Sequence, residues 1–241
     1  MIVNALDHIE HPDFNDVVIH FTGRVGPSLR PKAIEAMTDW ERLSAVVGDS
    51  RLIGQEMPGS RASAVCFTEA TSRGCAWLIS AGRYSSCGIA FSKAFLFSAG
   101  GGPVLQVRGD EWSSVFSWTE SMRARAVRFW PGASSGTGER LPWWLEGRSE
   151  WLFEREWRVP TPEGHLTFDF SNIAFLVLPS VDHLTNWVQV TAPVDRALSE
   201  NLASCRYVVL GPSGIETANG VRQRPTTTSL ESTEKRAVRE A

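Results

Sequence analysis

The sequence has little lysine, few cysteines, no long apolar run and no strong excess of charge of either sign. Only 3 of its 24 basic residues are lysine, and the formal net charge is −3 with a pI near 6.0. This balance gives no overall electrostatic reason to bind nucleic acid, although a local basic patch is compatible with it. The longest apolar runs, such as "IAFLVL" at 173–178, are far too short to cross a bilayer.

Two further absences concern compartment and phosphate binding. The four cysteines form no CxxC pair, and the opening "MIVNALDHIEHPDF" lacks the basic and apolar regions of a signal peptide. We therefore expect free thiols in a reducing compartment and a cytoplasmic protein without a membrane segment. The triglycine at 100–102 lacks the GK[ST] ending of a phosphate-binding loop, so we expect a flexible turn there.

The composition instead predicts one sizeable folded domain. The chain has 241 residues, of which 42% are hydrophobic, and this is enough to bury a substantial core. Beyond about Thr217 the sequence becomes polar, in the stretch "TANGVRQRPTTTSLESTEKRAVREA". We expect a single domain over residues 1–216 and a polar, flexible tail over residues 217–241.

Hydrophobic patterns predict both helices and many short strands. Apolar residues at helical spacing indicate helices at 31–47, 71–84 and 112–130. Strands are expected at 16–24 and 63–70, in "CGIAFSKAFLFSAGGGPVLQV" as a strand–turn–strand, and in "HLTFDF", "IAFLVLP", "WVQVTAP" and "YVVLGP". This mixture predicts an α+β fold with mixed, largely antiparallel sheets and flanking helices.

The stretch "WLFEREWRVP" at 151–160 carries the densest set of candidate functional residues. Trp157, Val159 and the stop at Pro160 favour a strand over a helix. On a strand, Glu154, Glu156 and Arg158 would share the face opposite Trp157. Two carboxylates on one face repel each other, so this face either binds a cation or polar ligand, or is solvated with Arg158 neutralising one acid.

Polar residues also interrupt other strand-like runs. In "HFTGR", His20, Thr22 and Arg24 would share one strand face and form a row that can contact a ligand. Each has a structural alternative, since a lone strand histidine is usually a satisfied core or edge residue. Glu69, in "FTEA", is either a carboxylate favoured by a helix N-terminus or a site residue. Tyr84 is either an aromatic at a strand start or part of the same site.

Five of these segments, in order, resemble the AbiGi-like abortive-infection family of bacterial phage-defence loci. The segments are "VIHFTGR", "VCFTEA", "YSSCGIAFSK", "GGGPVLQV" and "EREWRVP", and the resemblance covers roughly residues 16–180. Proteins of that family are described as the antitoxin side of a toxin–antitoxin pair. The resemblance thus implies a partner protein from the same defence locus or from a phage, and it does not itself imply an enzyme.

A looser resemblance links the chain to ADP-ribosyltransferases, and it implies an NAD site and an ADP-ribosyltransferase-like fold. "EREWRVP" is similar to their Glu-x-Glu strand, "VIHFTGR" to their first strand and "RYSSCGIAF" to their middle strand. It implies that Glu156 stabilises the oxocarbenium-like state formed when nicotinamide leaves and that Glu154 orients or deprotonates the acceptor. His20 and Tyr84 complete the implied catalytic set.

The same resemblance implies the contacts to NAD. Tyr84 would stack on nicotinamide, His20 and Thr22 would bind the ribose or the amide, and Arg24 would bind the diphosphate. The complete set of expected NAD-binding residues is His20, Thr22, Arg24, Glu69, Tyr84 and Arg158.

Three functional hypotheses follow. The first is an NAD-using ADP-ribosyltransferase or NAD hydrolase of a phage-defence or toxin–antitoxin system, with protein, nucleic acid or water as the acceptor. The second is a catalytically silent antitoxin or interaction module with the same fold. The third is a nuclease in which Glu69, Glu154 and Glu156 hold Mg²⁺; under the favoured first hypothesis no metal is expected.

Overall fold

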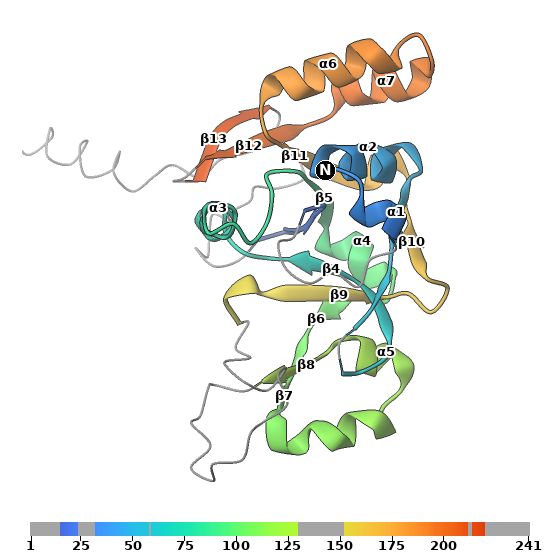
Figure 1. The fold of residues 1–241 in the computed structure, drawn as a ribbon, viewed down its shortest axis with the longest axis vertical. Helices are drawn as coiled ribbons and strands as arrows, with labels where there is room; N and C mark the ends of the chain where they lie inside the picture. Colours follow the sequence, from blue (N-terminus) through green and yellow to red (C-terminus); the bar gives the residue numbers. More distant parts are fainter. Residues whose placement is uncertain (1–14, 24–31, 58, 130–151, 212–213, 220–241) are drawn as a thin grey trace, which may run out of the picture.

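A nine-stranded sheet forms the centre of the computed structural model, which describes residues 15–23, 32–57, 59–129, 152–211 and 214–219 (Figure 1). Its order is β13-β12-β11-β5-β1-β4-β9-β6, with β3 paired to β4 beside this path. All neighbours are antiparallel except β11 and β12. The strands are β1 (Val17–Phe21), β3 (Gln55–Glu56), β4 (Ser63–Thr68), β5 (Gly88–Ser92), β6 (Gly102–Pro103), β9 (Glu156–Pro160), β11 (Ile173–Leu178), β12 (Tyr207–Gly211) and β13 (Gly214–Asn219).

Two small sheets and a set of short helices surround the large sheet. β2 (Arg51–Ile53) pairs antiparallel with β10 (His165–Thr167), and β7 (Leu105–Arg108) pairs parallel with β8 (Ala126–Phe129). The α-helices are α1 (Lys32–Glu35), α2 (Asp39–Gly48), α3 (Ser72–Ser80), α4 (Lys93–Ser98), α5 (Glu120–Ala124), α6 (Val181–Thr191) and α7 (Arg196–Ser204). Three 3-10 helices are η1 (Gly109–Ser117), η2 (Leu152–Glu154) and η3 (Phe170–Asn172). The predicted α+β class is confirmed.

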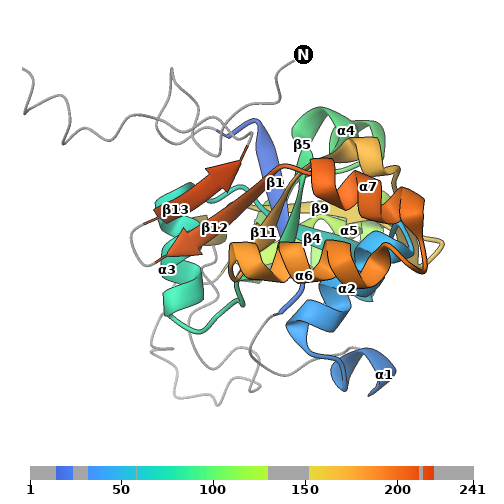
Figure 2. The ribbon, with the colours of Figure 1, turned by 90° about the horizontal axis from the view of Figure 1, so that it is seen from above.

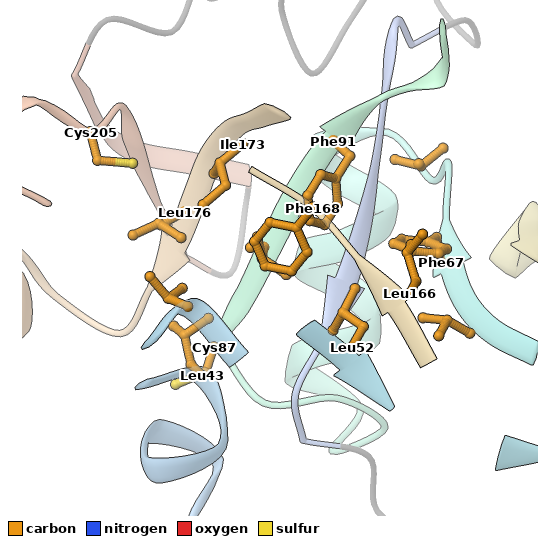
Figure 3. Packing of buried hydrophobic residues seen from close by; sticks show 14 of the residues in the cluster. Leu43, Leu52, Phe67, Cys87, Phe91, Leu166, Phe168, Ile173, Leu176 and Cys205 are labelled. Carbon is orange, nitrogen blue, oxygen red and sulfur yellow. The ribbon is translucent and has the colours of Figure 1, made fainter. Parts of the chain in front are cut away.

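The large sheet separates two hydrophobic cores, because alternate residues of each strand face opposite sides. The α2 face buries Val18 and Phe67 against residues of α2, α4, α6, α7 and the β2–β10 ribbon (Figure 3). The α3 face buries Ile19 and Phe21 against α3 and the partly buried Tyr84. Seen from above, α6 and α7 lie side by side over the α2 face (Figure 2). Each polar residue of β1, β4 and β9 can therefore be assigned to one face.

Two segments predicted as strands are helices. α4 forms in "SKAFLFS" because the Ser92 side chain accepts a hydrogen bond from the Phe95 amide and Leu96 enters the core. The "WVQVTAP" stretch belongs to α6, which begins earlier and buries Leu184 and Trp187 three residues apart. The residues from Trp187 onward alternate like a strand, and the helical period becomes apparent only when the preceding residues from Val181 are included.

Two segments predicted as single helices are interrupted. Over 31–47, the helix restarts at Thr38, whose side chain forms a capping box with Glu41. Over 112–130, the chain forms η1, then α5 capped by Thr119, and then the strand β8. A side-chain cap inside an apolar repeat thus divided both segments.

The C-terminal boundary also differs from the expected one. β13 pairs with β12 through Tyr207↔Asn219, so residues 217–219 belong to the large sheet rather than to the tail. The rest of the expected tail, residues 220–241, lies outside the described residues. Among the helices that the structure describes, none combines the length and apolar composition needed to cross a membrane.

Candidate functional site

A cleft opens in the large sheet along one edge of β4. The other edge pairs continuously with β9, but this edge has partners only at its two ends. β3 pairs with the start of β4 at Gln55↔Ala64, and β1 pairs with its end at Ile19↔Thr68. Between these two points the β4 edge makes no ladder pairs with either strand. The cleft there has a volume of about 80 Å³, and its polar lining includes His20, Cys66, Thr68, Tyr84 and Glu156. This space suits one small ring rather than a whole dinucleotide, since pockets for drug-sized ligands usually exceed about 300 Å³.

Glu156 lies at this cleft and is held by a buried arginine. It pairs with Thr68 across β4 and β9, which directs its side chain to the α3 face. Arg158 donates two hydrogen bonds to it, from Nε to Oε1 at 2.9 Å and from Nη2 to Oε2 at 3.1 Å. Only 11% of the Glu156 side chain is exposed. A bidentate guanidinium fixes the plane of the carboxylate, so its remaining lone pairs have a defined direction.

Arg158 is itself built into the protein rather than into the cleft. Arg158 is 8% exposed, and its Nη1 donates to the carbonyls of Ala124 at 3.3 Å and Ala126 at 2.8 Å. Burial is the largest single effect on Arg158 and lowers its pKa, but the charge and hydrogen bonds of Glu156 and Cys66 together outweigh burial, so the pKa is raised overall. The ion pair with Glu156 is the neutralisation of one acid that was expected of Arg158.

Glu154 does not share the strand face of Glu156, contrary to the prediction for 151–159. It ends η2, and the next residue, Arg155, has a left-handed φ of 46°, which breaks the strand alternation. The residue is 3% exposed; its carboxylate pairs with Arg83 and accepts a hydrogen bond from Tyr84 Oη at 2.9 Å. Buried between these partners, Glu154 holds Tyr84 in place and is not positioned to deprotonate an acceptor.

Tyr84, which was expected to stack on nicotinamide, lies on the wall of the cleft. Its ring stacks on Phe21 with centroids 5.1 Å apart and lines the cleft. Because Glu154 fixes its hydroxyl, the ring has contacts at both its face and its tip. Sequence reasoning missed Arg83, the second partner of Glu154; its position beside Tyr84 in "GRYSS" was the available signal.

His20 lies on β1, but the strand ends at Phe21, so Thr22 follows the strand instead of continuing the predicted row. Both side chains lie on the α2 face, opposite Glu156. His20 Nδ1 lies 2.8 Å from the Cys66 carbonyl, which can only accept, so Nδ1 carries the proton. The ring therefore satisfies a β4 carbonyl at the gap in the ladder. Thr22 is buried and donates to the carbonyls of Asp39 at 2.8 Å and Cys87 at 3.2 Å. Arg24, the third member of the predicted row, lies outside the described residues.

Glu69 lies on the α2 face and binds the start of β9. Its carboxylate accepts from Arg155 Nη2 at 2.6 Å and Trp157 Nε1 at 2.6 Å, and it pairs with Lys93 Nζ at 2.9 Å. These contacts hold Arg155 and Trp157 on one side, and Glu156 between them points to the other side. Glu69 thus orients β9 and lies away from the cleft, although it was expected to bind NAD.

The three candidate carboxylates do not form a metal site. In the part of the chain that the structure describes, no group of three or more His, Cys, Asp or Glu side chains could hold a metal ion. Glu69, Glu154 and Glu156 each pair with a different arginine instead. The geometry therefore gives no support to the nuclease hypothesis.

Comparisons of the chain with protein-family models, with curated proteins and with solved structures give no match. The chemistry of the cleft is therefore the structural basis for a functional proposal.

Proposed function

We propose that this protein breaks the nicotinamide–ribose bond of NAD, either to transfer ADP-ribose or to hydrolyse NAD, within a bacterial phage-defence or toxin–antitoxin system. The observation that carries the proposal is the position of Glu156. It is an ionisable carboxylate on the wall of a cleft that also presents Tyr84 and His20, and the resemblance to ADP-ribosyltransferases implies a catalytic role for all three.

The proposed chemistry needs one fixed negative charge. The bond between ribose C1′ and the nicotinamide nitrogen breaks, nicotinamide leaves with the bonding electrons, and positive charge develops on the ribose. Glu156, oriented by Arg158, stabilises this charge. An oxygen or nitrogen of the acceptor then bonds to C1′ and releases its proton to the solvent; in hydrolysis the acceptor is water.

The remaining residues take supporting roles in this proposal. Tyr84 offers a ring face to nicotinamide, and its hydroxyl is anchored by Glu154. The buried position of Glu154 leaves Glu156 as the single reacting carboxylate. The cleft of about 80 Å³ would take the nicotinamide end, with the rest of NAD extending beyond it.

The second candidate is a catalytically silent antitoxin or interaction module. It is favoured by the fact that all three candidate carboxylates are ion-paired with arginines. Under this alternative, the same ion pairs stabilise the fold, and the protein acts only through a partner protein.

Nicotinamide release tests the proposal. Purified wild type, Glu156→Gln and the matched control Glu163→Gln, an exposed turn residue, are incubated with NAD and a lysate containing natural targets. We expect turnover by wild type and by the control, and a loss on the order of 10²–10³ for Glu156→Gln. Thermal melts of each variant show whether the loss comes from unfolding.

Tyr84→Phe serves as a second variant because it removes one hydroxyl and keeps the ring. It should stay folded and raise KM or lower kcat through a less fixed ring. No nicotinamide release by wild type, or equal turnover by a folded Glu156→Gln variant, would reject the enzyme and favour the interaction module.

A further inference from the structure

Two large aromatic side chains lie exposed beside the candidate site. Trp77 of α3 is 56% exposed and Phe153 of η2 is 46% exposed. Their rings make an edge-to-face contact with centroids 5.7 Å apart. Rings of this size contribute most when they are buried, so an exposed touching pair is typical of a binding surface. We name Trp77, Phe153 and the adjoining Arg73 and Arg83 the aromatic platform.

The exposed charge of the platform comes from Arg73, because the Arg83 side chain is 22% exposed and is paired with the buried Glu154. The Arg83 guanidinium carbon lies 5.8 Å from the centroid of the Phe153 ring. Arg73 is exposed and lies one helical turn before Trp77 on the same face of α3. The α3 sequence contains no acidic residue, and Glu154 beneath the platform is 3% exposed. The surface therefore complements a ligand that combines flat rings with negative charge.

The platform is continuous with the cleft. Arg83 and Tyr84 bind the same Glu154 carboxylate, Arg83 on the platform side and Tyr84 on the cleft side. A chain-like ligand stacked on Trp77 could therefore present its next unit to the wall that carries Tyr84 and Glu156.

We propose that the aromatic platform binds single-stranded nucleic acid, with a base stacked on Trp77 or Phe153 and a phosphate at Arg73. An unpaired base exposes the ring face that such stacking needs, whereas bases in a duplex stack on one another. A protein partner would more often meet charges of both signs around the aromatic residues, and none of the exposed residues of α3 is acidic. Under the proposed function, on which this step rests, the bound strand is the acceptor of ADP-ribose.

Binding of a labelled oligonucleotide tests this without any need for NAD turnover. We measure the fluorescence anisotropy of two labelled oligonucleotides of twelve nucleotides, oligo(dT) and oligo(U), at low salt. The proteins are wild type, Trp77→Ala, Trp77→Phe and Phe153→Ala. We expect Trp77→Ala to weaken binding about tenfold or more, and Trp77→Phe to restore much of it. Phe97→Ala is the matched control, because Phe97 is 74% exposed on α4 and lies outside the platform; it should leave affinity within about twofold.

Arg73→Ala separates charge from stacking. It should weaken binding and reduce the slope of log affinity against log salt by roughly 0.7, the value for one phosphate contact on a single strand. Oligonucleotide binding without nicotinamide release would support nucleic-acid binding by the platform and reject the proposed function. NAD turnover without oligonucleotide binding would support the proposed function and reject nucleic-acid binding by the platform.

Four results would overturn the proposal. They are no binding to either oligonucleotide at low salt, equal affinity for a duplex of the same length, equal losses for Trp77→Ala and Phe97→Ala, and full displacement of the oligonucleotide by excess NAD. Full displacement by NAD would make the platform a site for the dinucleotide. No binding to either oligonucleotide, combined with Trp77-dependent binding of a purified partner protein, would make it a protein interface.

Discussion

Arg158 shows how one side chain can couple the cleft to the fold. It is buried, and it binds the Glu156 carboxylate and two carbonyls of the α5–β8 segment. Arg158→Met would leave Glu156 and both carbonyls without their donor. Removing one partner of a buried ion pair costs about 3–5 kcal/mol, so we expect a loss of that size in the free energy of unfolding.

A urea titration measures this loss, with Arg51→Met as the control. Arg51 is largely exposed and lies 4.0 Å from its nearest carboxylate, so the control should change stability by less than about 0.5 kcal/mol. Arg158→Lys should recover only part of the stability because an ammonium cannot bind a carboxylate in the bidentate way. A loss below about 1 kcal/mol for Arg158→Met would contradict its structural role.

Thiol reactivity tests burial at the residue scale. Burial raises the pKa of Cys87 to about 12 and that of Cys205 to about 12, so at pH 8 only about one thiol in ten thousand is ionised at each. Cys75 is fully buried, whereas Cys66 is partly exposed at the cleft. We expect a disulfide reagent at pH 8 to label Cys66 first and the others only after unfolding, as read by peptide mass spectrometry.

The same shifts give a direction to the pH dependence of stability. The unfolded chain releases the protons of Cys87 and Cys205 near pH 9, and the folded chain releases them only near pH 12. The free energy of unfolding therefore falls as the pH rises through that window. In the labelling experiment, the contradicting result is that Cys87 of the folded protein reacts as fast as Cys66. That result would show that the Cys87 thiol is not buried.

At the scale of elements, the end of α2 offers a stabilising change. Ser50 follows the C-cap Asp49 and has a left-handed φ of 49°, which costs a residue with a Cβ roughly 1 kcal/mol relative to glycine. We expect Ser50→Gly to raise the free energy of unfolding by about 0.5–1 kcal/mol in a denaturant titration. The control Ala45→Gly, inside α2, should lower it by about 1 kcal/mol; a loss for both variants would contradict the left-handed helix end.

The elements most accurately predicted from the sequence are those whose burial matches a short, simple period. β11 is a fully buried apolar run, and β1 and β4 are β-branched runs next to polar turns. The sequence also predicted a strand over the 151–159 run, and its second half is β9, Glu156–Pro160. It failed at Glu154 because the left-handed backbone of Arg155 is maintained by the contact with Glu69, 86 residues away in the chain. No local pattern contains that contact.

At the scale of the whole molecule, the roles of the site residues depend on strand neighbours that one sequence does not specify. His20 was a plausible ligand from its strand alone. Only the sheet order shows that the β4 edge is left open between β1 and β3 and that His20 binds the carbonyl exposed there. Likewise, Glu156 and His20 were expected to act together. The pairing register directs their side chains to opposite faces of the sheet, and both line the cleft that opens between the strands.

The position of β13 decides where the chain can be shortened. Residues 217–219 pair with Tyr207, Val208 and Val209 at the edge of the large sheet, and β13 also packs on α3. We expect a chain ending at Asn219 to melt within a few degrees of the full chain, because the residues beyond it are polar and poor in apolar side chains. A chain ending at Glu216 should melt clearly lower, since β12 loses half of its edge partner and α3 loses contacts with β13. Circular dichroism melts of the three chains measure this, and oligonucleotide binding by each chain shows whether the platform depends on the edge of the sheet.

Two outcomes would contradict these expectations. Equal melting of the two shortened chains would mean that residues 217–219 add nothing to the sheet. A large drop for the chain ending at Asn219 would mean that the polar segment packs on the domain.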